Sequence, residues 1–167
     1  MGDQPNWACC QKCDTLVFAG GEAGACAAGG THEHRGGANF VVPMEARANT
    51  QTKWRCCAKC AALTYAGGAA QTACAAGGAH VAGENGYRPE ALMLHEPPFG
   101  ATGQPGWRWC RKCDGMTFGG GVMQGECPAG AGHDDSVSGH YWMFFTADPL
   151  PLGLQAGPSR FICDAAA

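Results

Sequence analysis

Large aliphatic side chains are scarce in this chain. Leu, Ile, Val and Phe together account for 21 of its 167 residues, whereas glycine alone accounts for 27. A chain this poor in core-forming residues is typically disordered when it is also highly charged, but here charged residues make up only 15%. The sequence also contains 12 cysteines. We therefore expect bound metal to replace part of the missing apolar core, because a structural zinc site contributes on the order of 10 kcal/mol to folding.

Long apolar runs, helical periodicity and a basic excess are absent as well. No segment approaches the roughly 20 apolar residues of a membrane span, and no basic and apolar leader opens the chain. We therefore expect a cytoplasmic protein, with non-classical export or a mature secreted form as alternatives. No window of about 11 residues has a 3.6-residue period, which favours an all-β fold. The net charge of −3 argues against binding to nucleic acid or to anionic membranes.

One pattern of cysteine and histidine occurs three times, as Cys-x2-Cys, then a third cysteine after 12 or 13 residues, then a histidine after five more. Cys3His is a common ligand set of structural zinc sites, and a Cys-x2-Cys turn often opens it. A disulfide framework or free thiols are the alternatives, but disulfides do not require a histidine at a fixed distance. We predict three Zn²⁺ ions per chain, bound by Cys10, Cys13, Cys26 and His32; by Cys57, Cys60, Cys74 and His80; and by Cys110, Cys113, Cys127 and His133.

A lysine lies between the paired cysteines of every copy, at Lys12, Lys59 and Lys112. Three thiolates around one Zn²⁺ leave a net charge of about −1, so a nearby cation would stabilise the site. Each lysine is therefore either a supporting cation or simply an exposed side chain.

The repeat extends beyond the metal ligands. Gln-x-x-Trp precedes each ligand set, with the tryptophan three residues before the first cysteine, at Trp7, Trp54 and Trp107. After the Cys-x2-Cys turn, a short run alternates in the manner of a β-strand and ends in a Gly-Gly turn. We predict that a return strand then carries the third cysteine and that a last strand contains Phe40, Tyr87 or Tyr141. The sequence therefore predicts one domain, 1–167, built of three four-stranded units at about 4–49, 51–100 and 104–148, with a tail at 149–167.

The shared motif resembles a tandem repeat of bacterial proteins. In those proteins the repeat also tends to occur three times. The resemblance implies no particular activity. The Gln-x-x-Trp element is similar, more loosely, to the Gln-x-Trp repeat of ricin-type β-trefoil lectins. That resemblance implies a three-fold, β-trefoil-like arrangement rather than a sugar specificity. Three independent zinc knuckles on a string are the alternative, and the motif tryptophans distinguish the two, because they should share a core only in the trefoil-like case.

Three residues next to the first ligand do not fit the metal pattern, namely Cys9, Cys56 and Trp109. Neighbouring strand residues face opposite sides, so we expect these three to be apolar fillers near the pseudo-threefold centre. A fourth metal site or a Cys9–Cys56 disulfide is the alternative. Cys163 has no assigned role.

No catalytic residues are predicted, because four protein ligands leave no open position on the zinc and no His-Glu-x-x-His motif is present. We therefore predict a non-catalytic module that binds a carbohydrate or a protein surface through loops and exposed aromatic residues. The alternatives are a structural protein that assembles into oligomers or fibres and, with less support, a nucleic-acid-binding zinc ribbon. The candidate ligand-binding residues are Trp142, Tyr141, Tyr87 and Phe99, although Tyr87 and Tyr141 would serve equally well as core residues.

Overall fold

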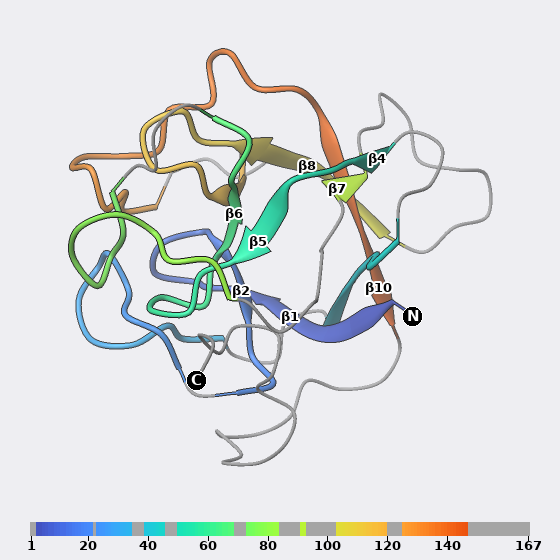
Figure 1. Cartoon of the computed structure of the whole chain (residues 1–167), viewed down its shortest axis with the longest axis horizontal. Helices are drawn as coiled ribbons and strands as arrows, with labels where there is room; N and C mark the ends of the chain where they lie inside the picture. The colour runs from blue at the N-terminus through green and yellow to red at the C-terminus, as the bar shows by residue number, and fades with distance from the viewer. Residues whose placement is uncertain are drawn as a thin grey trace.

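The computed structural model describes residues 3–21, 23–34, 39–45, 50–68, 73–83, 91–92, 103–119 and 125–146 (Figure 1). These residues form ten strands and no helix, so none of them lies in a helix able to cross a membrane. The all-β prediction is confirmed for this part of the chain. The strands are β1 (Gln4–Cys9), β2 (Leu16–Phe18), β3 (Asn39–Val42), β4 (Thr50–Gln51), β5 (Trp54–Cys56), β6 (Leu63–Tyr65), β7 (Ala91–Leu92), β8 (Gly103–Trp109), β9 (Met116–Phe118) and β10 (Tyr141–Thr146).

Six of these strands form one antiparallel sheet, in the order β2-β1-β3-β10-β8-β9. The remaining strands make two short ladders, β4-β7 and β5-β6. The two edges of the large sheet approach each other, because Thr15, just before β2, forms a bridge with Thr117 of β9. The sheet is therefore nearly closed, which leaves little edge exposed.

The same hairpin begins each of the three sequence repeats. The motif tryptophan of the first strand lies opposite an aromatic residue of the second, with ring centroids 5.4–5.6 Å apart. A left-handed residue just before each tryptophan bends the first strand, with φ of 71° at Asn6, 71° at Lys53 and 92° at Gly106. The paired residues are Trp7 and Phe18, Trp54 and Tyr65, and Trp107 and Phe118.

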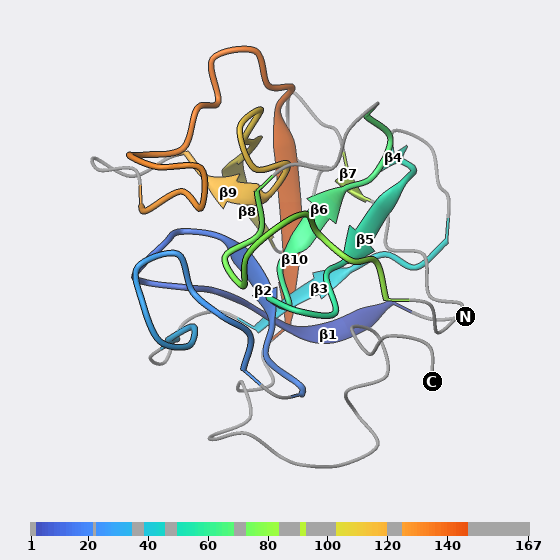
Figure 2. The same cartoon turned by 60° about the vertical axis from the view of Figure 1, so that its left-hand side comes forward.

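The three hairpins meet around a common centre (Figure 2). Each touches both others through isolated bridges, which join Val17 to Ala62, Thr64 to Gly115 and Thr15 to Thr117. Three backbone hydrogen bonds repeat this cyclic order, from Phe18 N–H to Ala61 O, from Tyr65 N–H to Asp114 O and from Phe118 N–H to Asp14 O, at 2.8–2.9 Å. The three hairpins therefore contact one another in a closed cyclic order.

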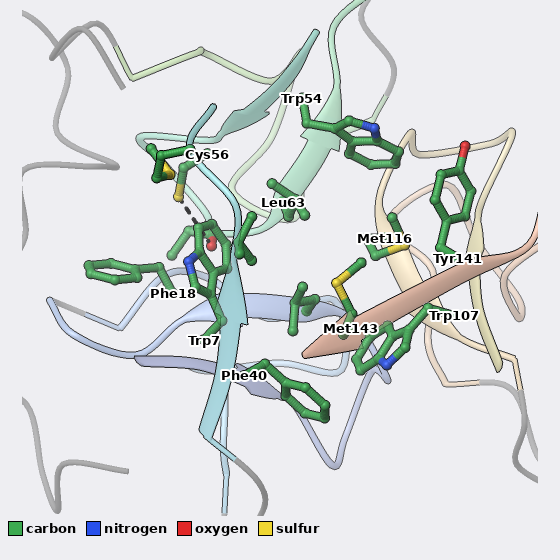
Figure 3. Packing of buried hydrophobic residues seen from close by; sticks show 14 residues of the cluster. Trp7, Phe18, Phe40, Trp54, Cys56, Leu63, Trp107, Met116, Tyr141 and Met143 are labelled. Carbon is green, nitrogen blue, oxygen red and sulfur yellow. Dashed lines mark hydrogen bonds between the residues drawn. The ribbon is translucent and has the colours of Figure 1, made fainter. Parts of the chain in front are cut away.

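The three motif tryptophans lie in one core (Figure 3). Trp7, Trp54 and Trp107 are fully buried and belong to a single cluster that also contains Leu63 and Met116. Independent knuckles would leave these side chains in separate, solvent-facing positions. The three tryptophans instead share one cluster. Their size also explains how so few aliphatic residues are enough, because aromatic rings bury large areas.

The segments that carry the third cysteine are not strands, in contrast to our prediction. Each is a tight turn closed by a single bridge, Ala25 with Thr31, Ala73 with Ala79 and Glu126 with Gly132. Local hydrogen bonds such as Cys26 N–H to Gly30 O satisfy the backbone there, so no strand partner is needed. The tail at 149–167 and Tyr87 lie outside the described residues.

One position in these turns allows the left-handed backbone conformation to be tested by substitution. It has a left-handed conformation in all three units, with φ of 64° at Gly30, 65° at Gly78 and 55° at Ala131. A side chain costs about 1–2 kcal/mol in this region, partly offset by the entropy that glycine loses on folding. We expect Ala131→Gly to stabilise the chain by about 0.5–1 kcal/mol in thermal unfolding, and Gly78→Ala to destabilise it by a similar amount. Equal and unchanged midpoints for both variants would contradict this expectation.

Candidate metal centres

Each ligand set begins with a tight Cys-x2-Cys knuckle between the two strands of a hairpin. In the first unit Cys10 N–H donates to Thr15 O at 3.0 Å, and Asp14 N–H donates to Cys10 O at 2.8 Å. The residue after the second cysteine is left-handed in every unit, at Asp14, Ala61 and Asp114. This geometry turns the chain so that both cysteine side chains point to the same side.

The third cysteine lies in a second knuckle that faces the first. Gly29 N–H donates to Cys26 O at 3.0 Å, and equivalent bonds join Gly77 to Cys74 and Gly130 to Cys127 at 2.9 Å. The glycine has φ of 94–97° in all three units, a conformation that other residues rarely adopt. The glycine-rich character of the sequence is therefore partly a requirement of this turn.

The distances between ligand atoms match a tetrahedral zinc ion. Zn–S bonds of about 2.3 Å and Zn–N bonds of about 2.0–2.1 Å place two sulfurs about 3.8 Å apart and sulfur and nitrogen about 3.6 Å apart. The first and third cysteine sulfurs are 3.9, 3.8 and 3.9 Å apart in the three centres. The second cysteine sulfur lies 3.5, 3.7 and 3.5 Å from the histidine Nδ1. The structure therefore brings all twelve predicted ligands together in three groups that could each hold a metal ion.

The centres are buried, and the first thiol of each is poised to ionise. All nine cysteines are buried, as are His80 and His133, while His32 is partly exposed. A hydrogen bond from Cys13 lowers the pKa of Cys10 to about 3, and one from Cys60 lowers the pKa of Cys57 to about 3. The backbone N–H of Glu33 also donates to Cys10 Sγ at 3.4 Å. The thiolate, the form that binds metal, is thus favoured at the first cysteine of these knuckles. The same hydrogen bond raises the pKa of the second cysteine, Cys13 or Cys60.

Each histidine uses its two ring nitrogens differently. Nδ1 faces the cysteines, whereas Nε2 donates to a backbone carbonyl of another unit, at 2.8–2.9 Å. Such a bond fixes the tautomer and the ring orientation of a metal-binding histidine. The donors and acceptors are His32 and Cys60, His80 and Cys113, and His133 and Cys13. Sequence reasoning missed these pairs, because a backbone acceptor leaves no signal in the residue types.

The repeated lysine joins the two knuckles of its own unit. Lys12 Nζ donates to Gly29 O at 2.7 Å, and Lys59 and Lys112 donate to Gly77 and Gly130 at 2.5 and 2.6 Å. The cation therefore holds the second knuckle in place by a carbonyl contact rather than by touching a sulfur. Its fixed place in the sequence indicated a role but not this partner.

The proposed aromatic platform is wrong for the two residues that the structure describes. Trp142 is 2% exposed and Tyr141 is 5% exposed. Trp142 packs edge-on against Phe144 at 4.7 Å, over Gly103, where a Cβ atom would overlap the indole. The Tyr141 hydroxyl donates to Gln51 Oε1 at 2.7 Å, and its ring packs against Trp54. Neither ring can stack on a sugar, and the other two candidates, Tyr87 and Phe99, lie outside the described residues.

The three filler positions differ from one another. Cys9 is a free thiol that packs against the core, and burial raises its pKa to about 12. Trp109 packs against the same cluster and donates to Asp114 Oδ1 at 3.0 Å. Cys56 is buried in the cluster as predicted, but it is not the unpaired filler that we expected, because it is disulfide-bonded. The Cys9–Cys56 disulfide considered as an alternative is not formed, because Cys9 is free.

The lowered thiol pKa values predict the effect of acid. A thiol whose pKa falls from 9.0 to about 3 on folding stabilises the folded state fully above pH 9, and this contribution is lost as the pH falls toward 3. Protons also compete with metal for every thiolate. We expect stepwise acidification from pH 7 to release metal and lower the melting temperature together, as followed by a zinc-sensitive dye and circular dichroism. A chain that keeps its metal and its melting temperature at pH 3 would contradict this.

No protein-family model, no curated protein and no solved structure matches the chain. The function of the chain must therefore be inferred from the geometry of the three centres.

Proposed function

We propose that the protein is a non-catalytic scaffold held together by three structural Zn²⁺ ions. The observation that supports this most is the agreement of six ligand distances, two in each centre, with a tetrahedral zinc ion. Zinc suits the ligands best among the common metals, because three thiolates and one imidazole exclude Mg²⁺ and Ca²⁺, which prefer oxygen.

A structural rather than a catalytic role follows from the coordination shell. Catalytic zinc sites keep one position for water or substrate, whereas structural sites are closed by four protein ligands. Each of the three centres offers four, and the ligands are almost entirely buried. A buried and complete shell gives substrate no approach to the ion.

We also propose that the three units form one domain with a β-trefoil-like arrangement. The first and last strands of every unit pair with each other, as β1-β3, β4-β7 and β8-β10. The hairpins contact one another in cyclic order, and the tryptophans share a core. These features support a three-fold domain in which no unit buries its core residues alone.

Binding of a carbohydrate or a protein surface stays a prediction, and Trp142 and Tyr141 are no longer part of it. The zinc ions would then hold loops in place, and binding would depend on the fold. A glycan array with the metal-loaded chain and a metal-free sample tests this: binding by the loaded chain alone would support it, and no binding by either sample would exclude a sugar ligand.

Replacement by Co²⁺ tests the ligand set directly. Cobalt in a tetrahedral thiolate site gives intense visible absorption and sulfur-to-metal charge transfer, and these bands should increase linearly up to three equivalents and be displaced by Zn²⁺. Cys26→Ser removes one thiolate of the first centre. The absorption should then saturate near two equivalents of Co²⁺, or the third of the absorption that the first centre contributes should weaken. An octahedral spectrum, or no saturation near three equivalents, would contradict the proposal.

A further inference from the structure

The histidine bonds between units form a closed cycle. His32 of the first centre donates to Cys60 O of the second, His80 of the second donates to Cys113 O of the third, and His133 of the third donates to Cys13 O of the first. Each donor is a ligand of one centre, and each acceptor is the backbone of a ligand of the next. No centre is therefore isolated from the other two.

A second set of bonds runs beside the first. The residue that follows each acceptor cysteine also accepts, through its carbonyl, an N–H from the unit that supplies the histidine. In the first pair, Cys60 O accepts from His32 and Ala61 O accepts from Phe18. Equivalent pairs are formed by Cys113 and Asp114, and by Cys13 and Asp14. Two consecutive carbonyls of each knuckle thus accept hydrogen bonds from the preceding unit.

Close backbone packing reinforces the contact. A Cβ atom at Gly24 would overlap the carbonyl group of Cys60, and one at Gly125 would overlap the backbone of Cys13. Gly24 is tied to its own centre, because its carbonyl accepts from His32 N–H at 3.2 Å. The loop that carries one histidine therefore lies directly on the knuckle of the next centre.

We propose that the three metal centres are coupled, so that the chain holds either all three ions or none. This inference depends on the proposed zinc sites. An empty centre does not fix its histidine ring, and the next knuckle then loses the donor to a buried carbonyl. The next centre is less well formed and binds metal more weakly, and because coupling is reciprocal the effect extends in both directions. Closure of the cycle means that loss of any one ion weakens both others.

The coupling makes the fold respond to metal over a narrow range of concentration. Partly loaded chains would be rare, and the chain would change from empty to full over a small change in free zinc. Couplings between sites commonly change affinity by roughly 5–150-fold. We expect the loss of one ion to lower the affinity of the remaining centres by at least about tenfold.

Native mass spectrometry of the full chain after partial removal of zinc by a chelator tests the proposal. At half of full loading, three independent and identical sites would give chains with one or two ions in about three quarters of the population. We expect these species to make up less than about one third, with chains carrying three ions and none dominating. A distribution that matches independent sites would overturn the coupling but leave three zinc sites intact, whereas a chain with no zinc at any stage would overturn the proposed function itself.

Two variants distinguish the effect of the histidine hydrogen bond on zinc loading from an effect of lower overall stability. His32→Cys keeps four ligands at the first centre but removes the N–H that reaches Cys60 O, so we expect the species with one or two ions to increase at least about twofold. Gln11→Ala is the matched control, because it removes an exposed 3.3 Å contact to Glu33 within the first unit, beside the same centre. The control should keep the wild-type distribution. An unchanged distribution in His32→Cys would overturn the assigned link, and if that variant does not fold, the wild-type distribution alone decides.

Discussion

Removal of the metal by a chelator at neutral pH should unfold the chain. Each structural zinc contributes on the order of 10 kcal/mol, whereas a whole domain is stable by only about 5–15 kcal/mol. Trp7, Trp54, Trp107 and Trp142 are all buried, so unfolding should shift tryptophan emission to longer wavelength. Emission and far-UV circular dichroism should change together as zinc is withdrawn.

Single substitutions extend this prediction to one ligand at a time. Cys113→Ser removes a thiolate from the third centre. It should lower the midpoint of unfolding far more than the same substitution at a core cysteine that binds no metal. Cys9→Ser is the matched control, since Cys9 packs against the core but lies outside all three ligand groups. We expect the control to cost about 1 kcal/mol. Equal costs for both variants would contradict a metal-stabilised fold.

A methyl group at either of two glycines should disrupt the contact between units. Gly24→Ala and Gly125→Ala place a Cβ atom on the backbone of Cys60 and Cys13, respectively, where no flexible side chain can move aside. Overpacking of this kind costs about 1–3 kcal/mol, and more when backbone has to move. We expect at least about 3 kcal/mol of destabilisation in chemical denaturation of the zinc-loaded chain.

Gly115→Ala provides the control for that experiment. A Cβ atom there would meet Cys113 Sγ at 3.4 Å and Thr15 Cγ2 at 3.6 Å, which are ordinary contacts. Replacing a glycine at such a position commonly stabilises a protein by about 0.4–1 kcal/mol, because the unfolded chain loses entropy. A control that is destabilised as much as Gly24→Ala would show that the close approach to Cys60 is not the cause.

The metal ligands could be predicted because their chemistry fixes their spacing. A tetrahedral ion accepts only certain turns, so Cys-x2-Cys and the histidine at x5 recur with almost no variation. The strand Leu16–Phe18 could also be predicted, since alternation and a following Gly-Gly turn are local signals. Its pairing with β1 could not, because the Gly-Gly turn pointed to a partner on its other side.

What could not be predicted depends on contacts between distant segments. Tyr141 and Trp142 are neighbours on β10 and should face opposite sides, yet both are buried, so both faces of β10 are covered at that end. The cycle of histidine bonds is equally hidden, because its acceptors are carbonyls that every residue has. The return strand was wrongly predicted at Cys26 because the knuckle satisfies its own backbone.

The zinc content of the intact chain tests the central claim most directly. Native mass spectrometry at neutral pH should give the mass of the chain plus three zinc ions, and denaturation in acid should return the metal-free mass with all nine ligand cysteines reactive toward a thiol reagent. A chain that is folded without metal, or whose nine ligand cysteines are paired in disulfides, would contradict the account.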